Sequence, residues 1–220
     1  MSLIGSIHTT FSGIRTTEAK MATVTSNVTN ADAAGYTKKI YQSNYTTANG
    51  IMTPSGGTVV GSLDAQLYKT TINDVTDKGY YSTLASYLDA YSTSLGTTSG
   101  ASGLSTALND LETQISALAT SPEDSSQKIN VVDAAETLAR TLNDISSGIQ
   151  DQRLQADQEI ATSVTAINSA LTTIDTLNQK ILSLQAQGAS TADLEDQRMV
   201  ALEGLAEQVD ISYFFDSSNQ

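Results

Sequence analysis

A stretch of about sixty residues in the middle of the chain has a pattern that only a helix satisfies. From Glu123 to Gln187 there is no proline and one glycine, Gly148. Apolar residues recur there at the three- and four-residue steps of one helical face: Ala135, Leu138, Leu142, Ile145, Ile149, Ile160, Val164, Ile167, Leu171, Ile174 and Ile181. The step of eleven residues from Ile149 to Ile160 shifts the phase of this heptad pattern. The segment is therefore predicted to be one very long helix, on the order of 90 Å at 1.5 Å per residue, or two nearly collinear helices.

Shorter helices are predicted on both sides of this segment. The helical period covers residues 63–95, 104–118 and the stretch from Ala192 to Val209. Gly96 suits the position just past a helix end, and residues 188–191 form another turn. Ser121 is interpreted as the N-cap of the long helix and Pro122 as its first helical residue. Residues 63–208 are thus predicted to be a helical rod domain.

The first thirty residues form a separate amphipathic helix in this interpretation. Glu18 and Thr25 interrupt an otherwise regular heptad seam, which Val24 widens. Its apolar members are Ile4, Ile7, Phe11, Ile14, Met21, Val24 and Val28. One face of this helix must be buried, either within its own domain or, as the heptad spacing favours, against a helical partner.

Residues 31–62 change character and are predicted to be an extended arm, with one possible hairpin. Gly35, Gly50, Gly56, Gly57 and Gly61 occur there with alternating polar and apolar residues. Alternation returns in residues 209–220, which are predicted to start a β domain. The expected fold is therefore mainly α: an elongated multi-helix bundle with long coiled-coil-like helices, an extended arm and the first strand of a β domain. Only 5% of residues are aromatic, which predicts a thin core.

The chain offers little material for catalysis. It has one histidine, His8, and no cysteine, so zinc sites and histidine- or cysteine-based nucleophiles are not expected. The acidic group Asp193, Glu195 and Asp196 begins a helix, where carboxylates complement the helix dipole. We predict no catalytic, cofactor-binding or metal-binding residues. The net charge of −13 argues against nucleic acid or an anionic membrane surface as a partner. No apolar run is long enough to span a bilayer, and no cleavable signal peptide is predicted.

The stretch TSNVTNADAAGYTKKI, residues 25–40, resembles the N-terminal motif of the bacterial flagellar axial proteins. Its signature residues are Ser26, Asn27, Asn30, Gly35, Tyr36 and Thr37. Tyrosine after Gly35 resembles the hook-associated protein 1 family, whereas rod and hook proteins usually have phenylalanine. Residues 103–124 are similar to the same family, and so is the helix that carries Asp193, Leu194, Asp196, Gln197 and Arg198. Val28, Thr29, Ala33, Ala34 and Lys38 depart from the family pattern.

The resemblance implies a structural protein that joins the hook of the flagellum to its filament. Its implied partners are copies of itself in a ring, hook protein on the proximal side, a second hook-filament junction protein on the distal side, the flagellar export apparatus and an export chaperone. It implies an extracellular location, reached by flagellar type III export. Residues 1–30 would line the central channel together with a C-terminal helix. Family members are longer, so the chain is expected to be a fragment or a shortened relative.

Two alternatives remain open from the sequence. One is a hook or distal-rod protein of the same superfamily, separated from the first interpretation by Tyr36 and by the long helix. The other is the coiled-coil stalk of a surface adhesin or sensor, which predicts a transmembrane or cleavable segment.

Overall fold

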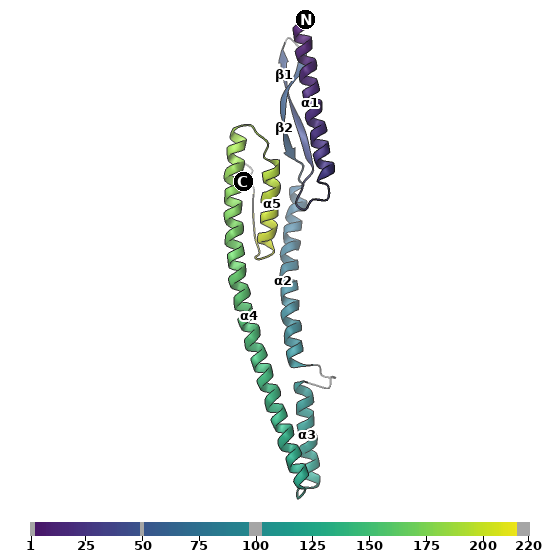
Figure 1. The fold of residues 1–220 in the computed structure, drawn as a ribbon, viewed down its shortest axis with the longest axis vertical. Coiled ribbons are helices and arrows are strands. Elements are labelled where there is room, and N and C mark those ends of the chain that lie inside the picture. The colour runs from purple at the N-terminus through teal and green to yellow at the C-terminus, as the bar shows by residue number, and fades with distance from the viewer. Residues whose placement is uncertain (1–2, 49–50, 97–102, 215–220) are drawn as a thin grey trace. The chain divides into compact units, whose positions relative to one another are not determined.

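The computed structural model describes residues 3–48, 51–96 and 103–214. These residues form helices α1 (Leu3–Thr29), α2 (Ala65–Leu95), α3 (Leu104–Thr120), α4 (Ser125–Ala186) and α5 (Ala192–Ala206), and strands β1 (Lys39–Ala48) and β2 (Ile51–Gly61) (Figure 1). The mainly α fold predicted from hydrophobic periodicity is confirmed.

The central segment is a single helix. Helix α4 runs without interruption through 62 residues, including Gly148 and the phase shift of the apolar seam. One glycine costs about 1 kcal/mol relative to alanine in a helix, which so long a helix tolerates. The structure therefore favours the first of the two arrangements left open by the sequence.

The start of α4 differs from the prediction that Ser121 is its N-cap. The backbone N–H of Ser121 is used by α3, donating to the carbonyl oxygens of Ala117 and Leu118 at 3.3 and 3.2 Å. The Asp124 carboxylate instead accepts the N–H of Ser126 at 2.7 Å. Ser121 and Pro122 thus lie between the two helices. The physical reason is that Ser121 closes α3, and an ionised acceptor is available at the later position.

The chain divides into two compact units. The first unit comprises residues 1–79 and 165–220, and the second comprises residues 80–164. Within the second unit, α2 and α4 are linked where Tyr87 donates to Glu159 at 2.7 Å. The predicted boundaries at residues 30, 62 and 208 stay predictions.

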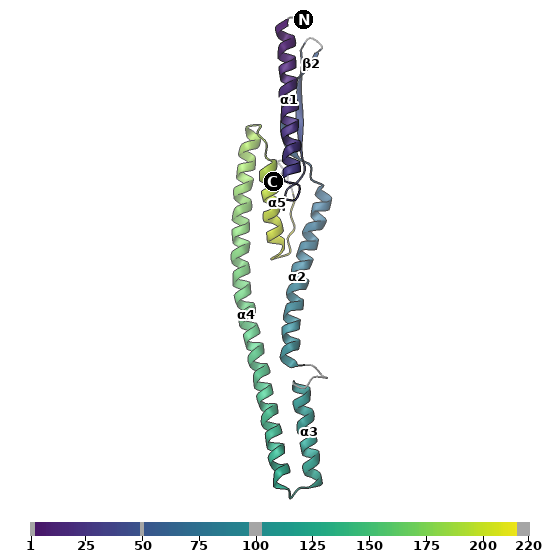
Figure 2. The same cartoon turned by 45° about the vertical axis from the view of Figure 1, so that its right-hand side comes forward.

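The predicted arm contains a long antiparallel hairpin in the first unit. Strands β1 and β2 pair from Lys39 opposite Gly61 to Ala48 opposite Ile51, with a bulge between Asn44 and Tyr45. Helix α1 contacts both strands and lies along the hairpin in two views (Figures 1 and 2). A two-stranded hairpin is marginal alone, so a covering helix is its natural support.

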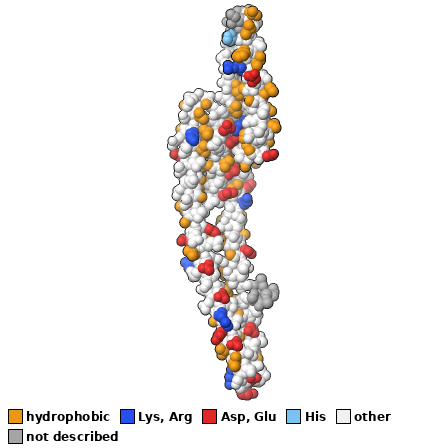
Figure 3. All heavy atoms as spheres, in the orientation of Figure 1, with side chains coloured by type: hydrophobic (Ala, Val, Ile, Leu, Met, Phe, Trp, Pro, Cys, Tyr) orange, Lys and Arg blue, Asp and Glu red, His pale blue; other side chains and the backbone are white. Residues whose placement is uncertain are grey.

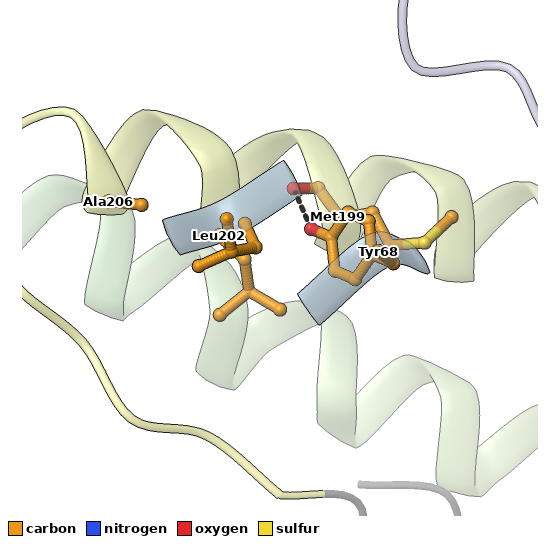
Figure 4. Packing of buried hydrophobic residues seen from close by; sticks show 5 residues of the cluster. Tyr68, Met199, Leu202 and Ala206 are labelled. Atoms are coloured by element: carbon orange, nitrogen blue, oxygen red, sulfur yellow. Dashed lines mark hydrogen bonds between the residues drawn. The ribbon is translucent and has the colours of Figure 1, made fainter. Parts of the chain in front are cut away.

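A small apolar core holds the helices of the first unit together. Tyr68 and Ile72 of α2 pack against Met199, Leu202 and Ala206 of α5 (Figure 4). The hydroxyl of Tyr68 donates to the carbonyl oxygen of Met199 at 2.7 Å, so its polar end is satisfied inside the core.

The β element predicted from residue 209 does not begin in the described residues. Residues 209–214 form no strand, and residues 215–220 lie outside the described part of the chain. Ile211 and Tyr213 instead pack against the core, with Tyr213 edge-on to Tyr68 at 6.0 Å between ring centroids. Their apolar side chains are partly buried against the helical core instead of in a sheet.

Candidate functional site

The first helix buries its polar face and exposes its apolar face. Residues two apart lie about 200° apart around a helix, so Thr9, Thr16 and Thr23 lie opposite Ile7, Ile14 and Met21. Thr16 and Thr23 are each 7% exposed, whereas Ile14 is 51% and Met21 66% exposed. The threonine side of α1 therefore faces the hairpin.

The threonine hydroxyls need no partner on the hairpin. Thr9, Thr16 and Thr23 each donate to the carbonyl oxygen four residues earlier, at 3.0, 2.9 and 2.9 Å. Such bonds satisfy a hydroxyl within its own helix. At Thr9, Thr16 and Thr23, α1 thus meets the hairpin with small side chains whose hydroxyls are already hydrogen-bonded.

The predicted seam is an exposed surface. Its described side chains range from 51% to 73% exposed: Ile7, Phe11, Ile14, Met21, Val24 and Val28. The side chain of Ile4 lies outside the described residues. Hydrophobic side chains gather on the surface over α1 in Figure 3. Covering each of them would contribute about 1–2 kcal/mol, so this face is suited to association.

The signature loop ties the end of α1 to the start of the hairpin. The side chain of Asn27 accepts the N–H of Lys39 at 2.9 Å and donates to its carbonyl oxygen at 2.9 Å. The Tyr36 hydroxyl donates to Asn27 Oδ1 at 3.0 Å and lies 3.2 Å from the hydroxyl of Ser26. Asn30 donates to the carbonyl oxygen of Ser26 at 2.9 Å. Ser26, Asn27, Asn30 and Tyr36 are therefore one hydrogen-bonded group.

The same loop binds the helix that carries the second predicted motif. Thr37 donates its hydroxyl to Asp196 Oδ1 at 2.5 Å and its N–H to Oδ2 at 3.3 Å. Gly35 has a φ of 75° and lies so close to α5 that a Cβ there would overlap a methyl group of Val200. Two motifs far apart in the sequence thus meet in the first unit.

Lys39 lies at the centre of this meeting point. It is 6% exposed, and its ammonium contacts both Asp193 and Asp196, the latter at 3.0 Å. Burial is the largest single influence on the pKa of Lys39 and lowers it, but the hydrogen bonds and charges of the two aspartates outweigh burial and raise the pKa above its ordinary 10.5. The ammonium also lies 4.2 Å from the centre of the Tyr36 ring.

The remaining residues of the α5 motif have different surroundings. Arg198 is 4% exposed and donates to Asn178 Oδ1 of α4 at 3.1 Å. The pKa of Arg198 is lowered overall, because the effect of burial outweighs the charges of Glu195 and Tyr68, which raise it. Leu194 is half-buried and Gln197 is exposed. Arg198 therefore supports the packing of α5 on α4, while Asp193 and Asp196 hold the loop.

Sequence reasoning missed Lys39, Tyr68 and Val200 as members of this site. A signal for Lys39 existed: successive residues of a strand face opposite sides, so of the pair Lys38 and Lys39 one must point toward the covering helices. Lys38 is exposed and Lys39 is buried. Tyr68 and Val200 had no comparable signal, because their importance depends on how helices far apart in sequence pack.

The described residues favour structural contacts over chemistry. Within residues 3–48, 51–96 and 103–214, no group of three or more histidine, aspartate and glutamate side chains is placed to hold a metal ion. In the same ranges, no helix has both the length and the apolar character needed to cross a membrane. His8 is exposed on α1.

In the part of the chain that the structure describes, five helices, one of them 62 residues long and another with an exposed apolar seam, and the structural contacts around Lys39 define a mainly helical structural protein. The chain belongs to the flagellar hook-associated protein family: the model described as flagellar hook-associated protein FlgK helical domain matches residues 88–220.

Two relatives match most of the chain. It is 24% identical over 229 residues to flagellar hook-associated protein 1 of Bacillus subtilis (strain 168), covering 95% of this chain and 45% of that protein. It is 28% identical over 200 residues to flagellar hook-associated protein 1 of Salmonella typhimurium (strain LT2), covering 87% of this chain and 36% of that protein. The chain thus spans less than half the length of these relatives. No solved structure matches it.

Proposed function

We propose that the protein is a structural component of the bacterial flagellum that joins the hook to the filament, by ring-like self-assembly at the distal end of the hook. Family membership supports the flagellar role. The observation that carries the assembly role is the exposed seam of α1, from Ile7 to Val28, on the side of the helix away from the hairpin.

The proposed partners follow from this location. Copies of the same protein form the ring, hook protein lies on the proximal side, and a second hook-filament junction protein lies on the distal side. In the assembled ring, a partner helix covers the apolar side chains of the seam, and their burial stabilises the contact. Long helices such as α4 suit the task because they span a long distance and present long faces for lateral packing.

The proposed function also includes the route of export and a chaperone that binds the protein before export. The protein leaves the cell through the flagellar type III pathway without a cleaved signal peptide, with a chaperone bound before export. An exposed apolar seam supports this last partner, because uncovered apolar surface promotes aggregation of a free subunit. The proposal assigns no enzymatic reaction to the chain.

Deletion of the gene in the source bacterium tests this function. A junction role predicts cells that carry hooks without filaments and do not swim, and restoration of swimming by the gene on a plasmid. Deletion cells without hooks would support the alternative of a hook or distal-rod protein. Cells that swim normally would contradict a flagellar role and favour a surface stalk.

A substitution in the seam tests the assembly surface itself. Phe11, which is 57% exposed, is replaced by aspartate, and exposed Lys20, which lies nine residues and about 180° away around the same helix, receives the same change as a control. Phe11→Asp is expected to leave the helical content unchanged and to abolish restoration of swimming, since a carboxylate cannot be buried in an apolar seam. Lys20→Asp is expected to restore swimming. Swimming cells with Phe11→Asp would refute the assignment of the seam.

A further inference from the structure

Three elements of the first unit meet at one buried side chain. Lys39 begins β1, its backbone is bound by Asn27 of α1, and its ammonium contacts Asp193 and Asp196 of α5. The side chain is 6% exposed, although lysine is rarely so buried without partners. Lys39 is thus bound directly by both α1 and α5.

The neighbouring contacts divide into an α1 side and an α5 side. On the α1 side, the Tyr36 hydroxyl binds Asn27 at 3.0 Å. On the α5 side, Thr37 binds Asp196 through its hydroxyl and its N–H. The side chains of the short segment 36–39 therefore hold one helix by neutral hydrogen bonds and the other by an ion pair and charge-assisted hydrogen bonds.

The contact along the rest of α1 does little to set its direction relative to α5. Thr16 and Thr23 face the hairpin, but their hydroxyls donate within α1. Beyond the loop, Ser190 donates to the carbonyl oxygen of Val59 at 2.7 Å, which tethers β2 to the turn before α5. A hydrogen bond of this kind restrains the distance between two elements more than it restrains their angle.

We propose that Lys39 is a positioning residue that fixes the angle of α1 and its hairpin relative to α5. Without the ammonium, Asp193 and Asp196 face each other with no cation between them, and Asp196 is left buried and unneutralised. The loop then moves away from α5, while Asn27 still holds the backbone at position 39. The expected result is a swivel of α1 with its hairpin, and the helical core stays folded.

Distances between spin labels on the two helices test the proposal. The chain has no cysteine, so Glu18→Cys and Gln197→Cys, both exposed, provide two unique labelling sites on α1 and α5. Lys39→Met removes the charge and keeps the stem, and Lys38→Met is the matched control on the exposed neighbour. The labelled protein and Lys38→Met are expected to give one narrow distance distribution. Lys39→Met is expected to at least double its width, with unchanged helical content by circular dichroism.

A second variant removes the charge from the other side. Asp196→Asn keeps the size of the side chain and an oxygen for Thr37, and it is expected to broaden the distribution as well. A distribution as narrow in Lys39→Met as in the control would overturn the proposal. Loss of helical content throughout the chain in both charge variants would also overturn it, because Lys39 would then serve general stability.

The consequence for assembly rests on the proposed function and is measured separately. In a deletion strain that does not swim, Lys38→Met is expected to restore swimming and Lys39→Met to reduce the swimming radius at least twofold, because the seam is misdirected. Full swimming with Lys39→Met would overturn this consequence. If deletion itself leaves swimming intact, the proposed function fails, and the spin-label distances still decide the role of Lys39.

Discussion

Asn27 binds both backbone groups of Lys39, its side-chain oxygen accepting the N–H and its amide nitrogen donating to the carbonyl, each at 2.9 Å. A neighbouring strand makes the same pair of bonds to a residue of an antiparallel ladder. The helix therefore supplies, through one side chain, the partner that the first residue of β1 would otherwise find in another strand. Only asparagine or glutamine carries a donor and an acceptor side by side in this way.

Asn27→Ala is expected to expose the amide of Lys39 to hydrogen exchange. The two lost hydrogen bonds leave buried backbone groups unpaired, which costs about 2 kcal/mol. The measurement is the exchange rate of the Lys39 amide by NMR, expected to rise at least tenfold. Asn44→Ala, on an exposed position of the same strand, is the control and is expected to leave this rate unchanged. A Lys39 amide equally protected in both variants would argue against the strand-like pair.

Gly35→Ala is expected to destabilise the first unit by about 2–4 kcal/mol. A φ of 75° costs alanine about 1 kcal/mol, and its Cβ would also overlap Val200. The comparison is Gly188→Ala, where φ is 68° and no atom lies within 4 Å of the added Cβ, so that about 1 kcal/mol is expected. Urea denaturation followed by circular dichroism measures both.

A second substitution separates the two costs at Gly35. Val200→Ala removes the overlapping methyl groups, and Val200 is 47% exposed, so its truncation alone costs little. The double variant Gly35→Ala, Val200→Ala is expected to recover most of the loss beyond 1 kcal/mol. Equal stability of the single and double variants would show that the overlap is relieved in another way.

The first unit is expected to lose stability as the pH rises above about 10. The pKa of Lys39 is raised above 10.5, and burial raises the pKa of Tyr68 above its ordinary 10.0. Both groups therefore bind their proton more tightly in the folded state, so their contribution is full below the unfolded pKa values and is lost as the pH rises through the folded ones. Urea midpoints between pH 8 and pH 11.5 measure this decline.

Two variants identify the groups responsible for the pH dependence. Tyr68→Phe and Lys39→Met are each expected to flatten the decline, because each removes a group that binds its proton more tightly in the folded state. Lys38→Met, on an exposed lysine, is expected to leave it unchanged. A decline that is as steep in all three variants would assign the effect to other groups.

Helix α1 is expected to exchange its amide hydrogens faster than α5 in the free protein. Its buried face is threonine, whereas α5 places Met199, Leu202 and Ala206 in the core. Local opening follows the amount of apolar surface that a helix buries. Hydrogen exchange with mass spectrometry is expected to show at least tenfold faster exchange for residues 6–20 than for residues 195–205. Equal protection of the two segments would contradict this view of α1.

The helices were predictable because their signal is local. The steps of three and four residues in α4, and the heptad from Ile7 to Val28, are fixed by the side chains of one segment. The beginning of α4 was not predictable in the same way. Ser121 and Asp124 are both good caps, and the choice depends on where α3 ends.

The site was predictable as two motifs and not as one. The loop from Ser26 to Thr37 and the α5 motif from Asp193 to Arg198 stood out in the sequence, but nothing local indicates that they touch. Their contact depends on a turn at Gly35 and on the place of α5 beside α2, which only the packing of the core determines. Strand alternation indicates that one of Lys38 and Lys39 is buried, but only the packing of α5 on the loop shows that it is Lys39.

The two faces of α1 are subject to different constraints: one supports the fold of the subunit and the other does not. A substitution at Thr16 or Thr23 changes how the helix rests on its own hairpin, whereas one at Phe11 or Met21 leaves the fold of the free chain nearly untouched. Mutations in the seam can therefore accumulate without lowering the stability of a single subunit. In the proposed assembly, the partner that covers the seam therefore constrains these residues, and the fold of the single subunit does not.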